Sequence, residues 1–381
     1  MTTIYLDHAA TTPVHPAVSA THYKLQQTIF GNSSSIHSNG REARKWLDDA
    51  RKTLAQSIQA EPTEIIFTSG GTEADNNAVF GTALAMKDKG NHIITTTIEH
   101  HAVLNPCKQL ELLGYDVTYL EVDDNAQISV EQVKAALTDQ TILVSIMYGN
   151  NEVGTIQPIR EIGELLKDHQ AKFHTDAVQA YGLIPLDVDE LGVDLLSVSA
   201  HKLNGPKGIG FLYQRKGTDT APLLFGGEQE RKRRAGTENI PAIVAFSEAV
   251  TIAEQEMDQS TDNYKKYADI LKTVLDEQGV SYEVNVDSHV EKLPHVFNIS
   301  FPGTDIESLL VNLDIAGIAV SSGSACTAGS LDPSHVLTAM FGAGSPKLRN
   351  SVRFSFGIGL DEDSVKKAAE ITAEIVQRLV K

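Results

Sequence analysis

The sequence is poor in several residue types, and each shortage excludes a class of protein. Only two cysteines, Cys107 and Cys326, occur in 381 residues, too few for a disulfide framework or for a structural zinc site built from thiolates alone. The 32 lysines and arginines are outnumbered by 50 aspartates and glutamates, which leaves a net charge of −18. Because the footprint of a direct nucleic-acid binder is usually basic, we expect no such partner. Solubility is the simplest explanation of the acidity.

Long apolar runs are also absent. No stretch of about 18 or more apolar residues occurs in the sequence, so we expect no transmembrane helix and no membrane partner. Residues 1–7 include neither a basic region nor a long apolar run, and we expect no secretory signal. With so few cysteines, these absences favour a reducing, cytoplasmic location.

The residues that are present predict an α/β fold. Short apolar runs alternate with helical patterns, which is typical of a mostly parallel sheet between helices. The length predicts two domains. The polar run at 258–263 is the best candidate boundary, between helices expected from Thr237 or Asn239 to about 256 and over 264–278. We therefore expect a large domain at 17–258 and a smaller α+β domain built from 1–16 and 259–381.

One lysine follows a predicted strand at 194–198. Ser199 and His201 flank this residue, Lys202, with side chains suited to hydrogen-bonding a phosphate. A lysine held at a strand end can lose solvent, which lowers its pKa and makes the amine a nucleophile toward a carbonyl. Asp176 ends another predicted strand, and a buried acid with a Schiff-base lysine suits a pyridoxal phosphate (PLP) site. The alternatives are a solvated lysine and an aspartate that caps a helix.

Further polar groups follow other predicted strands. Gly71 and Thr72 lie in a glycine-rich turn between a strand and a helix, where backbone N–H groups can bind an anion or simply form a tight turn. His100 and Asn151 follow two more strands. Because open α/β sheets bind ligands at the carboxyl ends of their strands, these residues are candidates for one site.

The C-terminal part adds a cysteine and an arginine. Cys326 lies among small and polar residues at 322–330, so we expect it to be exposed and its loop to be poorly ordered. It is either functional or an adventitious surface thiol. Cys107, beside Leu110 on a predicted helix, is expected to be a core or helix-face residue. Arg353 lies on an alternating strand, either as an edge-strand charge or as a bidentate carboxylate clamp.

With these residues in view, the chain resembles the PLP-dependent cysteine desulfurases of the NifS/IscS type, in the class V aminotransferase group of fold type I. The long Ser/Gly loop around Cys326 resembles the IscS-like branch more than the SufS-like branch. The basic run 231–234 departs most from the pattern, so the role of its arginines stays open. The motifs that carry the resemblance are at 5–12, 68–76, 150–152, 174–179, 199–202, 322–326 and 352–355.

The resemblance implies a PLP site and a homodimer. Lys202 would carry the cofactor as a Schiff base, and Asp176 would pair with its pyridine nitrogen. Gln179 would hydrogen-bond its phenolic oxygen, and His100 would stack on its ring and move protons. The phosphate would be held by Gly71, Thr72, Ser199, His201 and, from the neighbouring subunit, Thr237.

The resemblance also implies a reaction. Asn151, which also contacts the cofactor, and Arg353 would hold the carboxylate of L-cysteine. Cys326 would accept its sulfur as a persulfide, leaving L-alanine, with no resident metal and at most transient ligation of a cluster shared with a partner. The sulfur would serve Fe–S cluster assembly or thiolation, through an IscU-type scaffold, a tRNA-thiolating enzyme or a thiamine-pathway carrier. Selenocysteine remains an open substrate.

Two other functions are consistent with parts of this pattern. A PLP aminotransferase or lyase would keep Lys202, Asp176 and Arg353 but make no use of Cys326. A catalytically silent carrier or scaffold subunit would need no intact lysine or phosphate site. The presence of both makes the silent subunit the weaker hypothesis.

Overall fold

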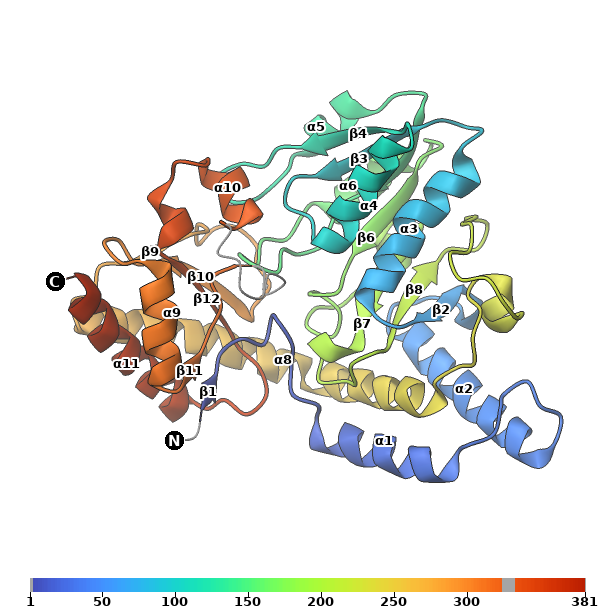
Figure 1. Ribbon diagram of the computed structural model, residues 1–381, viewed down its shortest axis with the longest axis horizontal. Coiled ribbons are helices and arrows are strands. Elements are labelled where there is room, and N and C mark those ends of the chain that lie inside the picture. The colour runs from blue at the N-terminus through green and yellow to red at the C-terminus, as the bar shows by residue number, and fades with distance from the viewer. Residues whose placement is uncertain (1–2, 324–332, 381) are drawn as a thin grey trace.

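The computed structural model describes residues 3–323 and 333–380, so Cys326 lies outside the described residues. Figure 1 shows a large sheet flanked by helices and a smaller part built mainly from the C-terminal third of the chain. The helices are α1 (Pro16–Thr28), α2 (Ser38–Gln56), α3 (Gly71–Met86), α4 (His101–Leu112), α5 (Val130–Ala136), α6 (Ile159–Leu166), α7 (Val188–Leu191), α8 (Ile240–Glu277), α9 (Ile306–Ile315), α10 (His335–Phe341) and α11 (Glu362–Val380). Short 3-10 segments are η1 (Pro62–Glu64), η2 (Ala200–Lys202), η3 (Gln229–Lys232) and η4 (Pro346–Arg349).

The strands form three sheets. They are β1 (Ile4–Tyr5), β2 (Ile65–Thr68), β3 (His92–Thr96), β4 (Asp116–Leu120), β5 (Thr141–Ser145), β6 (Lys172–Asp176), β7 (Leu195–Ser199), β8 (Gly210–Gln214), β9 (Glu283–Val284), β10 (Val296–Ser300), β11 (Ile318–Ala319) and β12 (Ser351–Ser355). The largest sheet has seven strands in the order β2-β8-β7-β6-β5-β3-β4. Strand β8 runs antiparallel to both of its neighbours, and the pairs from β7 to β4 are parallel. The predicted mostly parallel sheet between helices is confirmed.

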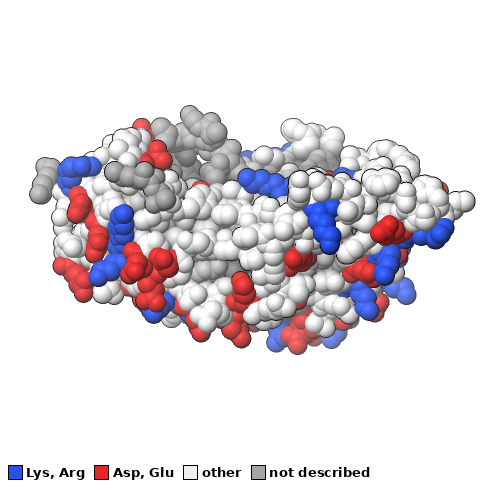
Figure 2. Space-filling view, turned by 90° about the horizontal axis from the view of Figure 1, so that it is seen from below, with Lys and Arg blue, Asp and Glu red and all other residues white. Residues whose placement is uncertain are grey.

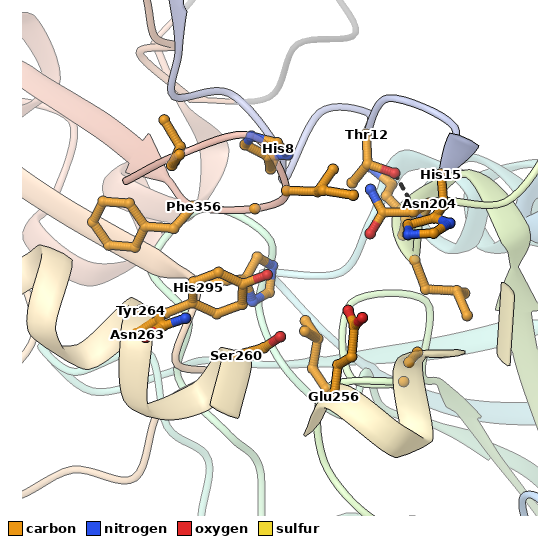
Figure 3. Close-up of a pocket in the computed structure, with 18 of the residues that line it drawn as sticks. His8, Thr12, His15, Asn204, Glu256, Ser260, Asn263, Tyr264, His295 and Phe356 are labelled. Carbon is orange, nitrogen blue, oxygen red and sulfur yellow. Dashed lines mark hydrogen bonds between the residues drawn. The ribbon is translucent and has the colours of Figure 1, made fainter. Parts of the chain in front are cut away.

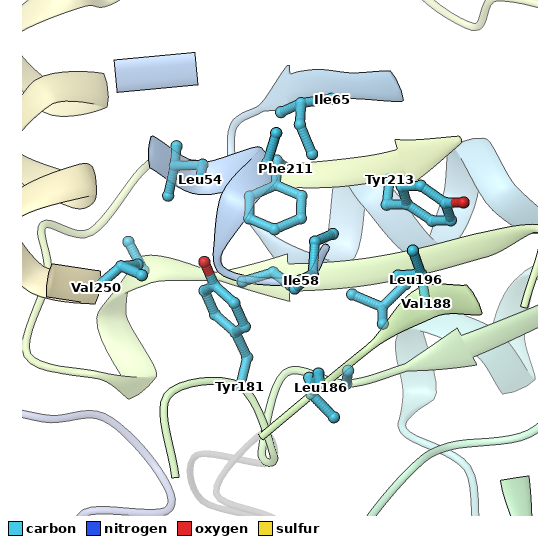
Figure 4. Packing of buried hydrophobic residues seen from close by; sticks show 14 of the residues in the cluster. Leu54, Ile58, Ile65, Tyr181, Leu186, Val188, Leu196, Phe211, Tyr213 and Val250 are labelled. Carbon is cyan, nitrogen blue, oxygen red and sulfur yellow. The ribbon is translucent and has the colours of Figure 1, made fainter. Parts of the chain in front are cut away.

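The central strands of this sheet are apolar because helices cover both faces. Every residue of β5 and of β7 is buried, as expected for parallel strands in an α/β protein. Figure 4 shows the packing on one face, where Tyr181, Phe211 and Ile58 meet side chains from α2 and α8. The rings of Tyr181 and Phe211 pack edge to face, with their centroids 5.5 Å apart. This rigid layer fixes the positions of the strand ends.

Helix α8 corrects one prediction. The turn expected at 258–263 is wrong, because α8 continues through it for 38 residues. The polar run includes neither glycine nor proline, and none of residues 251–266 is buried. Its polarity therefore reflects an exposed stretch of helix rather than a break. The first part of α8 packs against α1 and α2, and its last part packs against α11.

A second core lies in the smaller part. It is built on the antiparallel sheet β12-β10-β9 and on the parallel pair β1-β11. Its buried members include Leu6 and residues from Tyr267 onward, whereas the largest core includes residues from Val18 to Val250. The domain division proposed from the sequence stays a prediction, which this separation of the cores supports.

The surface carries charges of both signs. On the face shown in Figure 2, acidic and basic side chains are interspersed among uncharged ones, and the visible described residues form no continuous basic patch. Within 3–323 and 333–380, none of the helices combines the length and the apolar character needed to span a bilayer.

Candidate active site

A cavity of about 240 Å³ lies at the carboxyl edge of the parallel strands. Its lining includes ten residues predicted from the sequence: Gly71, Thr72, His100, Asn151, Asp176, Gln179, Ser199, His201, Lys202 and Arg353. Most come from the segments that follow β2, β3, β5, β6 and β7. The structure therefore brings together strand ends that are far apart in the sequence. Two candidates are not in this lining. Thr237 is exposed and does not line the cavity, and Cys326 lies outside the described residues.

Lys202 reaches this cavity from η2, directly after β7. Its Nζ donates hydrogen bonds to the carbonyl oxygens of Ala9 at 2.5 Å and Ala10 at 2.8 Å. Both alanines also line the cavity. The segment 7–12, whose individual residues were given no role in the sequence-based prediction, thus forms the wall against which the amine is held.

The glycine-rich turn forms the other end of the cavity. Gly70 is the N-cap of α3, and no side chain caps this helix. A Cβ at position 71 would lie 2.8 Å from Cγ2 of Val178, so the turn leaves no room for a larger residue there. A helix N-terminus without a side-chain cap presents backbone N–H groups to an anion. Ser199, which is buried, lies beside this turn.

His201 adds an imidazole near this end. Its Nδ1 lies 3.1 Å from Oγ1 of Thr11, and its carbonyl oxygen accepts hydrogen bonds from both the backbone N–H and the hydroxyl of Thr12. Burial is the main cause that lowers the pKa of His201 to about 4, with Lys202 adding to the shift. The ring is therefore neutral at neutral pH and can act as a hydrogen-bond donor.

Asp176 is a buried acid inside the cavity. It accepts a hydrogen bond from the backbone N–H of Val178 at 2.9 Å. Burial raises the pKa of Asp176 to about 6, against that hydrogen bond and the attraction of Lys202. A cationic group of a ligand placed next to Asp176 would stabilise its charged form, since pairing offsets the cost of burial.

Two further acids lie near Asp176. Burial and the charge of Asp176 raise the pKa of Asp75 well above its usual value. Burial also raises the pKa of Glu99 to about 8. Sequence reasoning gave these two residues no role, although Asp75 lies in the 68–76 motif and Glu99 precedes His100. An acidic residue next to a predicted site residue is a weak signal, because burial is not visible in the sequence.

His100 is the N-cap of α4. Its Nδ1 accepts a hydrogen bond from the backbone N–H of Ala102 at 3.1 Å, so the proton of the neutral ring lies on Nε2. Burial first, and then the positive charge of Lys202, lower the pKa of His100 to about 4. The imidazole is therefore uncharged at neutral pH, which suits stacking on a planar ligand.

Arg353 lies inside the protein rather than on an exposed sheet edge. The residue is 1% exposed. Its guanidinium pairs with Oδ1 of Asp7 at 2.7 Å and donates to the carbonyl oxygen of Asn151 at 2.9 Å. Strand β12 holds the arginine at the cavity wall, with Asn151 beside it. A buried arginine held in this way is suited to binding a carboxylate.

Gln179 lines the active-site cavity and contacts His295, which lines a second cavity. Its Nε2 donates to the carbonyl oxygen of Ala9 at 3.0 Å, and its Oε1 lies 3.1 Å from Nε2 of His295. Burial lowers the pKa of His295 to about 3, so its ring is neutral and donates from Nε2. The orientation of the Gln179 amide is thus fixed by Ala9, which accepts from its nitrogen, and by His295, which donates to its oxygen.

The second cavity, of about 150 Å³, also reaches Lys202. Figure 3 shows how His8, His295, Glu256 and Tyr264 meet around it, from the N-terminal segment, the residue before β10 and helix α8. Both ring nitrogens of His8 lack a hydrogen-bond partner among the described residues. Lys202 therefore lines two separate cavities.

Three residues of the basic run 231–234, namely Lys232, Arg233 and Arg234, make side-chain contacts within the chain. Arg234 pairs with Glu73 at 2.8 Å, next to Thr72. Residues Glu230, Arg231 and Lys232 have left-handed backbone conformations, with φ angles of 46°, 57° and 68°. Arg234 is therefore tied to the first turn of α3, and these contacts give the run no direct place in the cavity.

Cys107 lies in the core, one of the two predicted positions. It is 0% exposed on α4. Burial raises the pKa of its thiol to about 12. Because the thiolate is the reactive form of cysteine, Cys107 is unavailable as a nucleophile.

Comparison with known proteins gives consistent matches. The family model described as Aminotransferase class-V matches residues 4–367. A protein of Bacillus subtilis (strain 168) described as "Putative cysteine desulfurase IscS 1" is 60% identical over 385 residues, covering 100% of both chains. One from Methanosarcina thermophila, "Cysteine desulfurase IscS", is 47% identical and covers 99% of this chain and 92% of the relative.

Solved structures match over nearly the whole chain. A structure described as a NifS-like protein has a TM-score of 0.92 and 34% identity, and covers 99% of this chain and 100% of its own. Another, described as SspA in complex with cysteine, has a TM-score of 0.81 and 36% identity, and covers 92% and 98%. The fold of this chain is thus similar to the folds of these proteins.

Proposed function

We propose a function from the premise that this chain belongs to the class V aminotransferase family and, within it, to the cysteine desulfurases of the IscS and NifS type. The chain is a PLP-dependent cysteine desulfurase, which converts L-cysteine to L-alanine and transfers the sulfur to Cys326. The observation that carries the proposal is the shared cavity of Lys202, Asp176 and Arg353. There Lys202 would attach the cofactor, Asp176 would pair with its pyridine nitrogen, and Arg353 would pair with the carboxylate of an amino acid.

The described residues fit PLP. The N-terminus of α3 at Gly71 and Thr72, with Ser199 and His201, would hold the phosphate, and Lys202 would bind the carbonyl carbon. Asp176 would keep the pyridine nitrogen protonated, Gln179 would donate from Nε2 to the phenolic oxygen, and His100 would cover the ring. When bound, the cofactor supplies an electron sink for the substrate's Cα.

The protein groups then divide the work on L-cysteine. Arg353, oriented by Asp7 and by the carbonyl of Asn151, would bind the carboxylate, with the Asn151 side chain beside it. The Nζ of Lys202, once released from the cofactor, would take the Cα proton and later return a proton. Burial and the charge of Lys202 lower the pKa of His100 to about 4, so its imidazole is neutral at neutral pH and carries its proton on Nε2, from which it would move protons while it covers the ring.

Cys326 would be the sulfur acceptor. Its thiolate attacks the sulfur of the bound L-cysteine, so that a new S–S bond forms and the carbon–sulfur bond breaks. The electron pair of the broken bond stays on the carbon side, and protonation there gives alanine. Cys107 cannot replace it, because its thiol is buried and its pKa is about 12.

The partners follow from the same premise. The exposed position of Thr237 supports a homodimer in which this residue reaches the phosphate of the neighbouring subunit. The persulfide would pass to an acceptor protein such as an IscU-type scaffold or a tRNA-thiolating enzyme, in the cytoplasm. The small number of cysteines supports that location.

The test is the stoichiometry of alanine and sulfide with L-cysteine in the purified, PLP-loaded protein. Wild type and Cys107→Ser should form alanine at the same rate, whereas Cys326→Ser should keep the yellow colour and release almost no sulfide. Desulfuration by Cys326→Ser at the wild-type rate would contradict the proposal and leave a PLP enzyme of another specificity.

A further inference from the structure

His295 is a buried histidine through which the smaller sheet contacts Gln179. The residue is 4% exposed and directly precedes β10. Its carbonyl oxygen accepts a hydrogen bond at 2.9 Å from the backbone N–H of Phe356, which follows β12. Because β10 and β12 pair along their whole length, the backbone of His295 is held in place by the sheet. Its ring lies with Nε2 3.1 Å from Oε1 of Gln179, which follows β6 in the large sheet.

A backbone carbonyl determines which way the Gln179 amide faces. The oxygen and the nitrogen of an amide side chain exchange places when it rotates by half a turn, so only the hydrogen-bond partners distinguish the two orientations. The carbonyl oxygen of Ala9 can only accept, and Nε2 of Gln179 donates to it at 3.0 Å. The amide oxygen must therefore face His295, and the ring nitrogen that meets it must be a donor.

His295 is such a donor only as the tautomer that is protonated on Nε2. Burial lowers the pKa of His295 to about 3, and the positive charges of Lys202 and Arg353 act in the same direction, so the ring carries one proton at neutral pH. The other tautomer would turn a nitrogen lone pair toward Oε1 of Gln179, and two acceptors at 3.1 Å repel each other. The Gln179 amide and the His295 proton therefore fix each other.

Packing alone does not account for an imidazole at this position. Within the part of the chain that the structure describes, Nδ1 of His295 has no hydrogen-bond partner. The ring lines the second cavity together with His8 (Figure 3). A buried polar atom without a partner costs free energy, which an apolar ring of similar size would not. What the imidazole adds is one N–H group, which is donated to Gln179.

The orientation of Gln179 matters because its amide lines the active-site cavity close to the lysine. The carbonyl oxygen of Ala9 accepts from Nε2 of Gln179 and also from Nζ of Lys202, at 2.5 Å. An amide nitrogen carries two protons, so one remains for a ligand after the bond to Ala9. PLP carries its phenolic oxygen on the ring carbon next to the one that bears the aldehyde. A donor that shares an acceptor with Lys202 is therefore suited to that oxygen.

We propose that His295 is a positioning residue, whose Nε2–H holds the Gln179 amide with its nitrogen toward the active-site cavity and so keeps a donor on the phenolic oxygen of the bound cofactor. The inference rests on the proposed function, in which Gln179 donates to that oxygen. His295 touches neither substrate nor cofactor in this account. A donor at the phenolic oxygen stabilises negative charge there, so its loss should make the proton on the nitrogen that joins Lys202 to the cofactor harder to remove.

Substitutions of His295 separate the N–H group from the space that the ring fills. His295→Phe keeps a ring but has no donor, and His295→Leu is a second variant without a donor. His295→Gln restores an N–H, because Nε2 of glutamine lies as many bonds from the backbone as Nε2 of histidine. His8→Phe is the matched control, since His8 lines the same cavity and neither of its ring nitrogens has a partner among the described residues. Gln179→Ala, alone and combined with His295→Phe, tests whether the effect passes through the amide.

The readout is the pH titration of the visible absorption band of the PLP-loaded protein without substrate, which reports the proton on the nitrogen that joins Lys202 to the cofactor. In His295→Phe and His295→Leu the midpoint should rise by about one pH unit, a tenfold change in the equilibrium constant and the low end of what a hydrogen bond to a charged group contributes. His295→Gln and His8→Phe should titrate as wild type. Gln179→Ala should show at least the same rise, and adding His295→Phe to it should change nothing further.

A wild-type midpoint in His295→Phe or His295→Leu would overturn the inference. An equal rise in His8→Phe would also overturn it, because the cavity rather than the N–H group would then be responsible, and so would a further rise in the double variant. A wild-type protein that shows the titration but forms no alanine from L-cysteine would instead overturn the proposed function. The two failures are distinguishable because the titration is measured without substrate.

Discussion

Two groups of buried polar side chains differ in how far the protein itself satisfies them. On the sheet β12-β10-β9, Asn285 donates to Oδ1 of Asn298 at 2.7 Å and to Ser351 at 2.9 Å, and its own oxygen accepts from Ser300 at 2.8 Å. At the carboxyl edge of the large sheet, Asp176 accepts a hydrogen bond from the backbone N–H of Val178 and faces a cavity. Both groups are buried, yet only the second has hydrogen-bonding capacity left for a ligand.

This difference distinguishes buried polar side chains that stabilise the fold from those that can bind a ligand. A closed network of hydrogen bonds offsets the cost of burying its members and fixes a unique packing. The polar residues that line the cavity, which we call the open set, face space that a ligand can fill. The pKa values of Asp176 and His100, among others, are perturbed. Burial of a polar residue is therefore not evidence of a site unless the protein leaves it incompletely satisfied.

The largest effect is expected at Lys202, in the open set. Under the proposed function, Lys202→Ala would remove both the covalent attachment of the cofactor and the proton-transferring amine, so alanine formation should fall by about 10⁴-fold or more. Some cofactor should still bind through the phosphate site, measured as PLP released on denaturation. Turnover at the wild-type rate would show that the cavity has been assigned the wrong chemistry.

The next effect is expected at Arg353. Arg353→Lys keeps the charge but loses the planar, bidentate donor pair, and kcat/KM for L-cysteine should fall by about 100-fold, mostly through KM. Arg349→Lys is the control, because Arg349 is exposed and pairs with Asp305 at the surface. Equal KM values for the two variants would argue that the substrate carboxylate binds elsewhere.

The pH dependence of stability tests whether the buried histidines are held neutral. Burial lowers the pKa of several histidines to about 3 or 4, namely His8, His100, His174, His201 and His295. Between these values and the unfolded value of about 6.5, the unfolded chain binds more protons, so stability falls as the pH falls through this window. Asp75, Asp176 and Glu99, whose pKa values are raised, act in the opposite direction.

Because the histidines outnumber those acids, the net change should be destabilising toward acid. We expect a lower Tm at pH 5 than at pH 7, measured by calorimetry on one preparation of the protein. An unchanged or higher Tm at pH 5 would mean that the histidines are not held neutral in the folded state.

The smallest effect on activity is expected in the closed network of Asn285, Asn298, Ser300 and Ser351. Asn285→Ala leaves Oδ1 of Asn298 without this donor and removes one partner each from Ser300 and Ser351, which still bond each other, so it should cost about 1–3 kcal/mol in the free energy of unfolding. The activity per folded molecule should stay within about twofold of wild type, because no member lines the cavity. A large loss of kcat at unchanged stability would break the distinction between the two groups.

The sequence predicted the site better than it predicted the connections around it. Strand-end residues such as Asp176 and Lys202 could be grouped in advance, because parallel strands bring their carboxyl ends to one edge. The continuity of α8 through 258–263 could not, since turn-forming polar residues are also tolerated on the exposed side of a long helix. The partners of Arg353 and Gln179, including Asp7, Ala9 and His295, depend on tertiary contacts that no local pattern encodes.

The central claim is that sulfur from L-cysteine passes to Cys326 and not to Cys107. It is tested most directly by peptide mass analysis after one turnover of the PLP-loaded enzyme with L-cysteine. We predict the mass of one added sulfur atom on the peptide that carries Cys326, one alanine per sulfur, and an unmodified Cys107 peptide. Alanine formation with no sulfur on Cys326, or with sulfur on Cys107, would contradict the account.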